Sequence, residues 1–139
     1  MRKKPLQILL VEDNPADVEI ARLLLERSRL RHELQVARDG QEAVDLLSQE
    51  TPPDLILLDI HLPKKNGHEV LAELKEHPDL RNIPVVVLTI SNAEQDIGGT
   101  LQRGIQDYLL KGQLSSNVLA HSVREVIEEE RRADRKRAA

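Results

Sequence analysis

The stretch Leu55-Ile-Leu-Leu-Asp59 decides the fold of this chain, because four consecutive aliphatic residues run directly into a carboxylate. An unbroken aliphatic run of this length is typical of a strand in a parallel sheet that is covered on both faces. Similar but partly weaker segments occur on both sides of it. Five strands are therefore predicted, over residues 6–11, 32–36, 55–58, 84–88 and 108–110.

Segments with helical periodicity alternate with these strands. They cover residues 15–29, 41–47, 67–75, 92–103 and 116–132. At the first of them, Asn14 is a suitable N-cap and Pro15 suits the first helical position. Five strand–helix units of this kind predict an α/β, flavodoxin-like (βα)₅ fold: a five-stranded parallel sheet in the order 2-1-3-4-5, with helices on both faces.

The length of 139 residues predicts one domain. We expect residues 1–130 to form it and residues 131–139 to be a charged extension of the last helix. The net charge is −4, and the last nine residues carry +4, which leaves an acidic body of −8. An acidic body argues against a broad nucleic-acid surface, and a single aromatic residue, Tyr108, argues against base stacking.

The chain contains no cysteine, so disulfides, thiolate metal sites and cysteine nucleophiles are excluded. No apolar run reaches the roughly 20 residues that a membrane-spanning helix needs. The N-terminus lacks the apolar segment of a signal peptide. We therefore expect a cytoplasmic protein that uses neither membrane nor nucleic acid as a direct partner.

Chemically competent side chains follow four of the five expected strands at the point where each of these strands ends. Glu12 and Asp13 follow the first strand, Asp59 the third, Thr89 the fourth and Lys111 the fifth. In an open parallel sheet these ends form the ligand-binding edge. The strand order places the three carboxylates together, and like charges at that density favour binding of Mg²⁺. A carboxylate nucleophile with a metal, a hydroxyl and an ammonium group is suited to phosphoryl transfer.

Four motifs make residues 6–130 resemble the response-regulator receiver domains of two-component signalling. They are Ile8-Leu-Leu-Val-Glu-Asp-Asn14, Asp54-Leu-Ile-Leu-Leu-Asp59 followed by Leu62-Pro63 and Asn66-Gly67, Pro84-Val-Val-Val-Leu-Thr89, and Gly104-Ile-Gln-Asp-Tyr-Leu-Leu-Lys111. The Glu-Asp-Asn-Pro and Leu-Pro-Lys-Lys-Asn-Gly stretches are most similar to those of stand-alone receivers, including receivers that are paired with phytochrome-type kinases. The combination of motifs is far more specific than any one of them.

The resemblance implies a phosphoacceptor and a metal site. Asp59 would accept the phosphoryl group and contribute to the Mg²⁺ site. Asp13 would bind the ion directly, Glu12 would act through a metal-bound water, and the backbone carbonyl of His61 would complete the protein ligands.

The resemblance also implies which residues respond to phosphorylation. Lys111 would pair with the phosphoryl group, Thr89 would move to hydrogen-bond one of its oxygens, and Tyr108 would change rotamer. Ile90 stands where receivers more often have a small residue, so it either shields the pocket or points into the core. Gly112 replaces the proline that usually follows the lysine, and we expect it to make the same tight turn through its tolerance of positive φ.

The predicted function is a phosphorylation-controlled switch rather than an enzyme, with only self-phosphotransfer and autodephosphorylation. A histidine kinase or phosphotransfer protein would supply the phosphoryl group. The fourth helix, fifth strand and fifth helix would then bind a target protein or a second copy of the chain. Three alternatives remain: a Mg²⁺-dependent phosphohydrolase that forms an aspartyl-phosphate, although His61 stands where such enzymes have a second aspartate; a flavin-binding protein; and an interaction module that works without phosphorylation.

Overall fold

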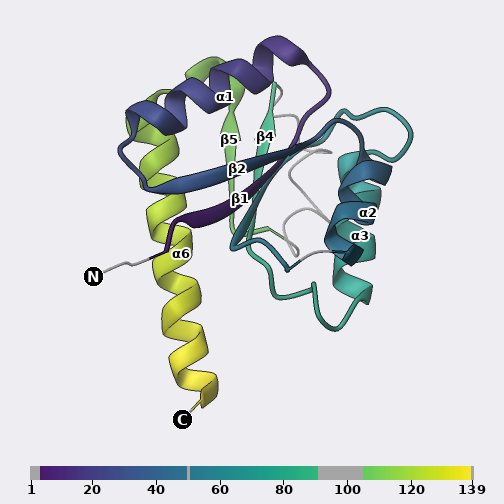
Figure 1. Ribbon diagram of the computed structural model, residues 1–139, viewed down its shortest axis with the longest axis vertical. Helices are drawn as coiled ribbons and strands as arrows, with labels where there is room; N and C mark the ends of the chain where they lie inside the picture. Colours follow the sequence, from purple (N-terminus) through teal and green to yellow (C-terminus); the bar gives the residue numbers. More distant parts are fainter. Residues whose placement is uncertain (1–3, 50, 91–104, 139) are drawn as a thin grey trace.

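The computed structural model describes residues 4–49, 51–90 and 105–138. They form a parallel sheet with the strand order β2-β1-β3-β4-β5 (Figure 1). The strands are β1 (Leu6–Val11), β2 (His32–Ala37), β3 (Leu55–Asp59), β4 (Val85–Thr89) and β5 (Asp107–Leu110). The predicted order and parallel pairing are confirmed, and no strand boundary differs from its predicted position by more than one residue.

The described helices are α1 (Pro15–Arg27), α2 (Gly40–Gln49), α3 (Gly67–Glu76) and α6 (Ser116–Ala138), with a short 3₁₀ turn, η1 (Lys111–Gln113). Helix α1 ends two residues earlier than predicted, because the Ser28 hydroxyl donates to the Leu25 carbonyl and Arg29 adopts a left-handed φ of 63°. Helix α6 continues beyond the predicted residue 132, through Arg, Ala and Lys residues that favour helix. The helix predicted over residues 92–103 lies outside the described residues.

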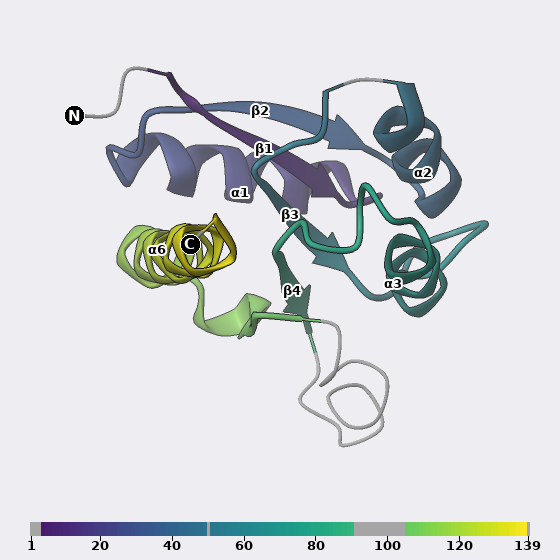
Figure 2. The ribbon, with the colours of Figure 1, turned by 90° about the horizontal axis from the view of Figure 1, so that it is seen from below.

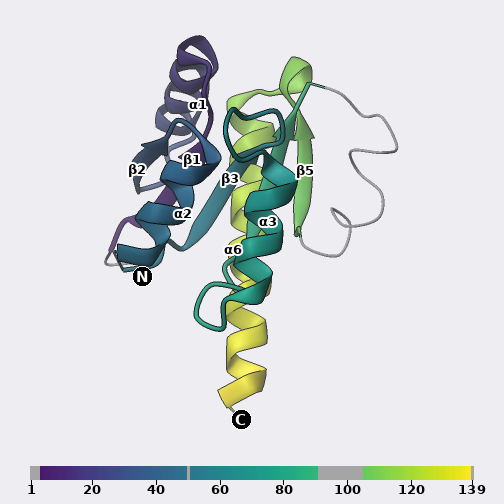
Figure 3. The ribbon, with the colours of Figure 1, turned by 90° about the vertical axis from the view of Figure 1, so that its right-hand side faces the viewer.

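Two helical layers enclose the sheet. Helices α2 and α3 cover one face and α1 and α6 cover the other (Figure 2). Successive strand residues point to opposite faces, so in β3 Ile56 and Leu58 pack in the α2/α3 layer while Leu55 and Leu57 pack in the α1/α6 layer. This double covering explains why the central strands are aliphatic at every position. The last turns of α6 extend past the end of the sheet (Figure 3).

The strands all point the same way, so their carboxyl ends share one edge of the sheet. We call this the carboxyl edge, and the opposite side, where the strands begin, the amino edge.

Among the described residues, no helix combines the length and the apolar character needed to cross a bilayer.

Candidate functional site

The carboxyl edge brings three acidic side chains together. Val11 at the end of β1 pairs with Leu58 of β3, so Glu12 and Asp59 follow from neighbouring positions in the register. Their carboxylate oxygens and one from Asp13 all lie within 4.8 Å of one another. Glu12 is 1% exposed and Asp59 4% exposed, whereas Asp13 is open to solvent. A cation entering from solvent would therefore meet Asp13 first and two buried carboxylates behind it.

Lys111 supplies a positive charge to this cluster from the end of β5. Its Nζ lies 2.6 Å from Glu12 Oε1, 2.9 Å from Asp17 Oδ2 and 3.4 Å from Asp59 Oδ2. Strands β1 and β5 are not neighbours, so the lysine side chain spans the ends of β3 and β4 to reach Glu12. The structure thus joins the lysine predicted from one end of the chain to the carboxylates predicted from the other.

Burial and charge shift the protonation of this group of residues. Burial raises the pKa of Glu12 from 4.5 to about 7, although its hydrogen bond to Lys111 acts in the opposite direction. For Lys111, burial by itself would lower the pKa. The hydrogen bonds to Glu12 and Asp17 and the charge of Asp59 outweigh it, and they hold the pKa of Lys111 above its ordinary value. Lys111 therefore stays positively charged, but its single charge faces a larger number of carboxylates.

This donor set fits a divalent metal ion. Mg²⁺ prefers hard oxygen ligands and retains several waters, so one or two direct carboxylates are enough. Backbone groups hold two of the carboxylates in place: the Asn14 N–H donates to Glu12 Oε2 at 3.3 Å, and the His61 N–H donates to Asp59 Oδ1 at 3.4 Å. A divalent ion would also offset the excess negative charge that Lys111 leaves uncompensated.

The loop after β3 is tightly packed behind Asp59. Gly67 begins α3 after a capping box between Asn66 and Glu69, and its N–H donates to the carbonyl of Ile60 at 2.9 Å. A Cβ atom on Gly67 would lie 2.7 Å from the carbonyl oxygen of Asp59. Glycine is therefore required at this position by close backbone approach, and α3 directly supports the acidic residue.

An open hollow of about 490 Å³ lies between the loop that follows β3 and the start of α3. Its lining consists of Ile60, His61, Leu62, Asn66 and His68. The His61 side chain is exposed, and its backbone follows Asp59 closely enough for the N–H contact to that carboxylate.

The other predicted residues occupy different environments. Thr89 is fully buried at the end of β4, one position beyond Leu88, which pairs with Asp59 in the register. Ile90 is 73% exposed, so the alternative in which it points into the core is wrong. Tyr108 is 39% exposed on β5, so it does not serve as a core residue. Gly112 has no positive φ and lies in η1, where a Cβ would have no atom within 4 Å, so the expected need for glycine there is also wrong.

Asp17 is the site residue that the sequence did not reveal. It lies in the first turn of α1, where acidic residues commonly stabilise the helix dipole, and that explanation needs no partner elsewhere. In the structure it accepts a hydrogen bond from Lys111, a residue 94 positions away. No local spacing in the sequence could indicate this contact.

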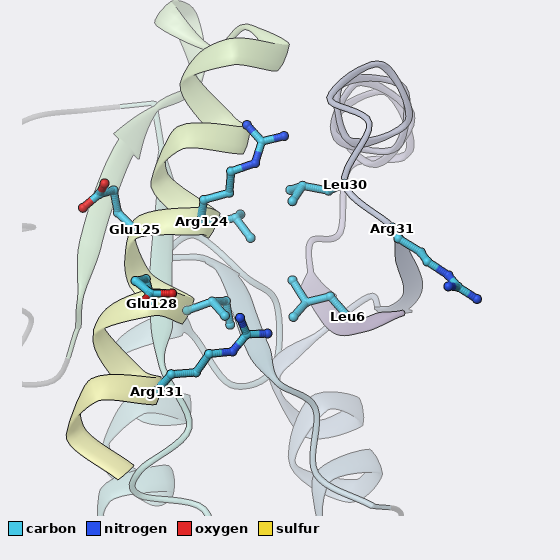
Figure 4. Close-up of a pocket in the computed structure, with 9 residues that line it drawn as sticks. Leu6, Leu30, Arg31, Arg124, Glu125, Glu128 and Arg131 are labelled. Carbon is cyan, nitrogen blue, oxygen red and sulfur yellow. The ribbon is translucent and has the colours of Figure 1, made fainter. Parts of the chain in front are cut away.

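A second cavity, of about 430 Å³, lies at the amino edge between α6, the start of β1 and the segment that precedes β2 (Figure 4). Leu6, Leu30, Val123 and Ile127 provide its apolar lining. The charged side chains around it are all exposed: Arg31, Arg124, Glu125, Glu128 and Arg131. Its chemistry is unlike that of the acidic cluster.

Comparison with known proteins identifies a consistent set of relatives. A family model described as the response regulator receiver domain matches residues 8–124. The response regulator Rcp1 of Synechocystis sp. is 48% identical over 113 residues, which cover 77% of this chain and 77% of Rcp1. The phosphorylated cyanobacterial phytochrome response regulator RcpA has a similar structure, with a TM-score of 0.75, 42% identity and coverage of 90% of this chain and 93% of RcpA. The Mn²⁺-bound form of Rcp1 has a TM-score of 0.72 at 40% identity, covering 91% of this chain and 89% of that one.

Proposed function

The chain belongs to the response regulator receiver family of two-component signalling, and we propose that it is a phosphorylation-controlled switch in which Asp59 accepts the phosphoryl group. One observation carries this proposal. Asp59 is a buried carboxylate that lies at the end of a central strand, within a group of acidic ligands and 3.4 Å from the Lys111 ammonium. That arrangement combines a nucleophile, a place for a cation and a cationic group for the transferred oxygens.

The proposed transfer requires a small number of roles. An Asp59 carboxylate oxygen forms a bond to phosphorus while the bond from phosphorus to the donor's histidine nitrogen breaks, and the nitrogen keeps that electron pair. Lys111 and the Thr89 hydroxyl hydrogen-bond the transferred oxygens. Mg²⁺, held by Asp13 directly, by Glu12 through a water, by Asp59 and by the His61 carbonyl, would neutralise the charge on the phosphoryl group.

We propose that the output is a change in the surface around β5 and α6. Receiver domains of response regulators interact with histidine kinases and with downstream targets. Here Thr89 would move towards the phosphoryl group, and the half-exposed Tyr108 would change rotamer, so a target or a second copy would bind one conformation preferentially. The resemblance also assigns to this face the helix predicted over residues 92–103, which lies outside the described residues. The relatives named as phytochrome response regulators make a phytochrome-type histidine kinase the first donor to test, and we expect the transfer to take place in the cytoplasm.

Intact mass spectrometry tests the proposal directly. The protein is incubated with Mg²⁺ and acetyl phosphate beside the variant Asp59→Asn, whose fold is checked by circular dichroism. We expect one phosphoryl adduct on the wild type and none on the variant. An adduct on both proteins would show that a residue other than Asp59 accepts the phosphoryl group. If the wild type forms neither an adduct nor a complex with beryllofluoride despite binding Mg²⁺, the switch function is wrong. Turnover of an added phosphomonoester would support the phosphohydrolase instead.

A further inference from the structure

Asp17 shares the key ammonium group of the site without belonging to its acidic cluster. The three carboxylates with ligand atoms within 4.8 Å of one another are those of Glu12, Asp13 and Asp59. Asp17 lies outside that group, yet its Oδ2 is 2.9 Å from Lys111 Nζ, closer than that of Asp59 at 3.4 Å. Its effect on a bound ligand would therefore operate through the lysine and through its own charge.

The first turn of α1 holds Asp17 firmly in position. Asn14 caps the helix, and its side-chain oxygen accepts from the N–H groups of Ala16 at 2.8 Å and of Asp17 at 3.3 Å. Pro15 occupies the first helical position, where its restricted φ is already helical. The carboxylate is thus directed at Lys111 from a rigid element.

Exposure indicates which partner the lysine releases when an anion binds. The Glu12 and Asp59 side chains are 2% and 6% exposed, whereas that of Asp17 is 30% exposed. A buried carboxylate that loses a hydrogen bond is left unsatisfied, and the full desolvation penalty then destabilises the protein. A partly exposed carboxylate forms a hydrogen bond with water in place of the lost one. Asp17 is therefore the partner whose bond to the ammonium breaks at the lowest free-energy cost.

We propose that Asp17 is a positioning residue that holds Lys111 in the unphosphorylated state and releases it to the phosphoryl group, so that its charge weakens anion binding at Asp59 and strengthens cation binding beside it. This inference rests on the proposed function. In the metal-free protein, Asp17 adds a negative charge near the cation site and competes for the ammonium that an incoming anion needs. Neutralising Asp17 must then move the two affinities in opposite directions.

The isosteric variant Asp17→Asn tests the inference with two measurements. Calorimetry gives the affinity for Mg²⁺ alone, and fluorine NMR gives the affinity for beryllofluoride, a phosphoryl mimic, at saturating Mg²⁺. We expect beryllofluoride to bind about fivefold more tightly and Mg²⁺ to bind about threefold more weakly, as fits the loss of one partly exposed, charge-assisted hydrogen bond. Asp17→Glu keeps the charge, so we expect its affinities for both ligands to stay close to those of the wild type.

Glu19→Gln is the matched control, because it removes the same charge from the same helix at a side chain that is 64% exposed and paired with Arg22. We expect it to leave both affinities unchanged. If Asp17→Asn lowers the affinity for both ligands or changes neither affinity, the positioning role is wrong, because a purely structural role predicts those results. If the wild type binds Mg²⁺ but forms neither a beryllofluoride complex nor a phosphoryl adduct, the proposed function itself is wrong, and the two failures are thus distinguishable.

Discussion

The two edges of the sheet carry similar numbers of charged residues but use them in different ways. At the carboxyl edge Glu12, Asp59 and Lys111 are largely buried and in direct contact, with Lys111 Nζ 2.6 Å from Glu12 Oε1. At the amino edge the charged residues are exposed and surround a cavity whose floor is apolar, with Leu6 4% exposed and Val123 fully buried. The strand ends therefore bury charge, whereas the charged side chains around the amino-edge cavity remain in contact with water.

This difference shows where the fold tolerates an electrostatic cost. A buried carboxylate is destabilising unless a cation compensates it. The carboxyl edge holds more carboxylates than Lys111 can compensate, which leaves it ready for a divalent ion. The amino edge has no comparable need, because water screens its charges.

The largest effect is expected from a carboxylate placed in the floor of the amino-edge cavity. Val123→Asp puts a charge at a fully buried position of α6 that is packed in the α1/α6 layer. We expect the free energy of unfolding to fall by about 4 kcal/mol or more, against about 2 kcal/mol for Val123→Ala. Urea denaturation measures both. At the opposite edge, Glu12→Gln should cost less than about 1 kcal/mol, because it removes a buried charge while Asp17 and Asp59 still pair with Lys111. Similar losses for Val123→Asp and Glu12→Gln would refute the contrast.

A methyl group on Gly67 should disturb the carboxyl edge through its backbone. The added Cβ would lie 2.7 Å from both the Asp59 carbonyl oxygen and the Ile60 Cα. Gly67→Ala should therefore lower the free energy of unfolding by about 1–3 kcal/mol and weaken Mg²⁺ binding. Gly112→Ala is the matched control, because nothing lies within 4 Å of its Cβ, and it should change stability by less than about 0.5 kcal/mol. Equal losses for the two variants would contradict the close packing behind Asp59.

Mg²⁺ binding should depend on pH through Glu12. Its pKa of about 7 means that a proton occupies this buried carboxylate below neutrality and must leave before the full charge is available to a cation. We expect affinity to fall by up to about tenfold from about pH 8 to about pH 6, which corresponds to roughly 1.4 kcal/mol. Calorimetry at both pH values measures it, and Glu12→Gln should remove most of the dependence. A wild-type affinity that is constant over this range would exclude the role of Glu12.

The raised pKa of Glu12 also affects stability. Without metal, the free energy of unfolding should fall as pH rises, whereas the affinity for Mg²⁺ should rise. The folded protein binds the Glu12 proton more tightly than the unfolded chain does, because burial raises the pKa from 4.5 to about 7. The contribution of Glu12 to stability therefore decreases as pH rises through that interval. Saturating Mg²⁺ should reduce this decrease, since the ion replaces the proton.

The smallest effect is expected from the exposed charges near the amino edge. Glu128 lies 4.0 Å from Arg132 and 3.8 Å from Arg135, and its side chain is 50% exposed. Glu128→Gln should change the free energy of unfolding by less than about 0.5 kcal/mol, and by less still at high salt. A loss above about 1 kcal/mol in urea denaturation would show that these surface pairs are structural.

The strands and the acidic cluster were accessible from the sequence because both follow from short-range patterns and a topological rule. An aliphatic run such as residues 55–58 indicates a doubly covered strand wherever it occurs. Parallel strands then place the residues that follow them at one edge, so Glu12, Asp13 and Asp59 were predicted together without coordinates. The family resemblance added roles for these residues that the pattern alone does not supply.

The sequence by itself therefore determined the βα alternation, the strand order expected for the fold and the identity of the residues at the carboxyl edge. Only the tertiary structure decided that Asp17 pairs with Lys111, that Ile90 points to solvent and that α6 forms a cavity with the start of β1. The physical reason is how far apart in the sequence the residues that determine each feature lie. Strand and helix patterns are set by neighbours along the chain, whereas these contacts depend on how whole helices pack against the sheet.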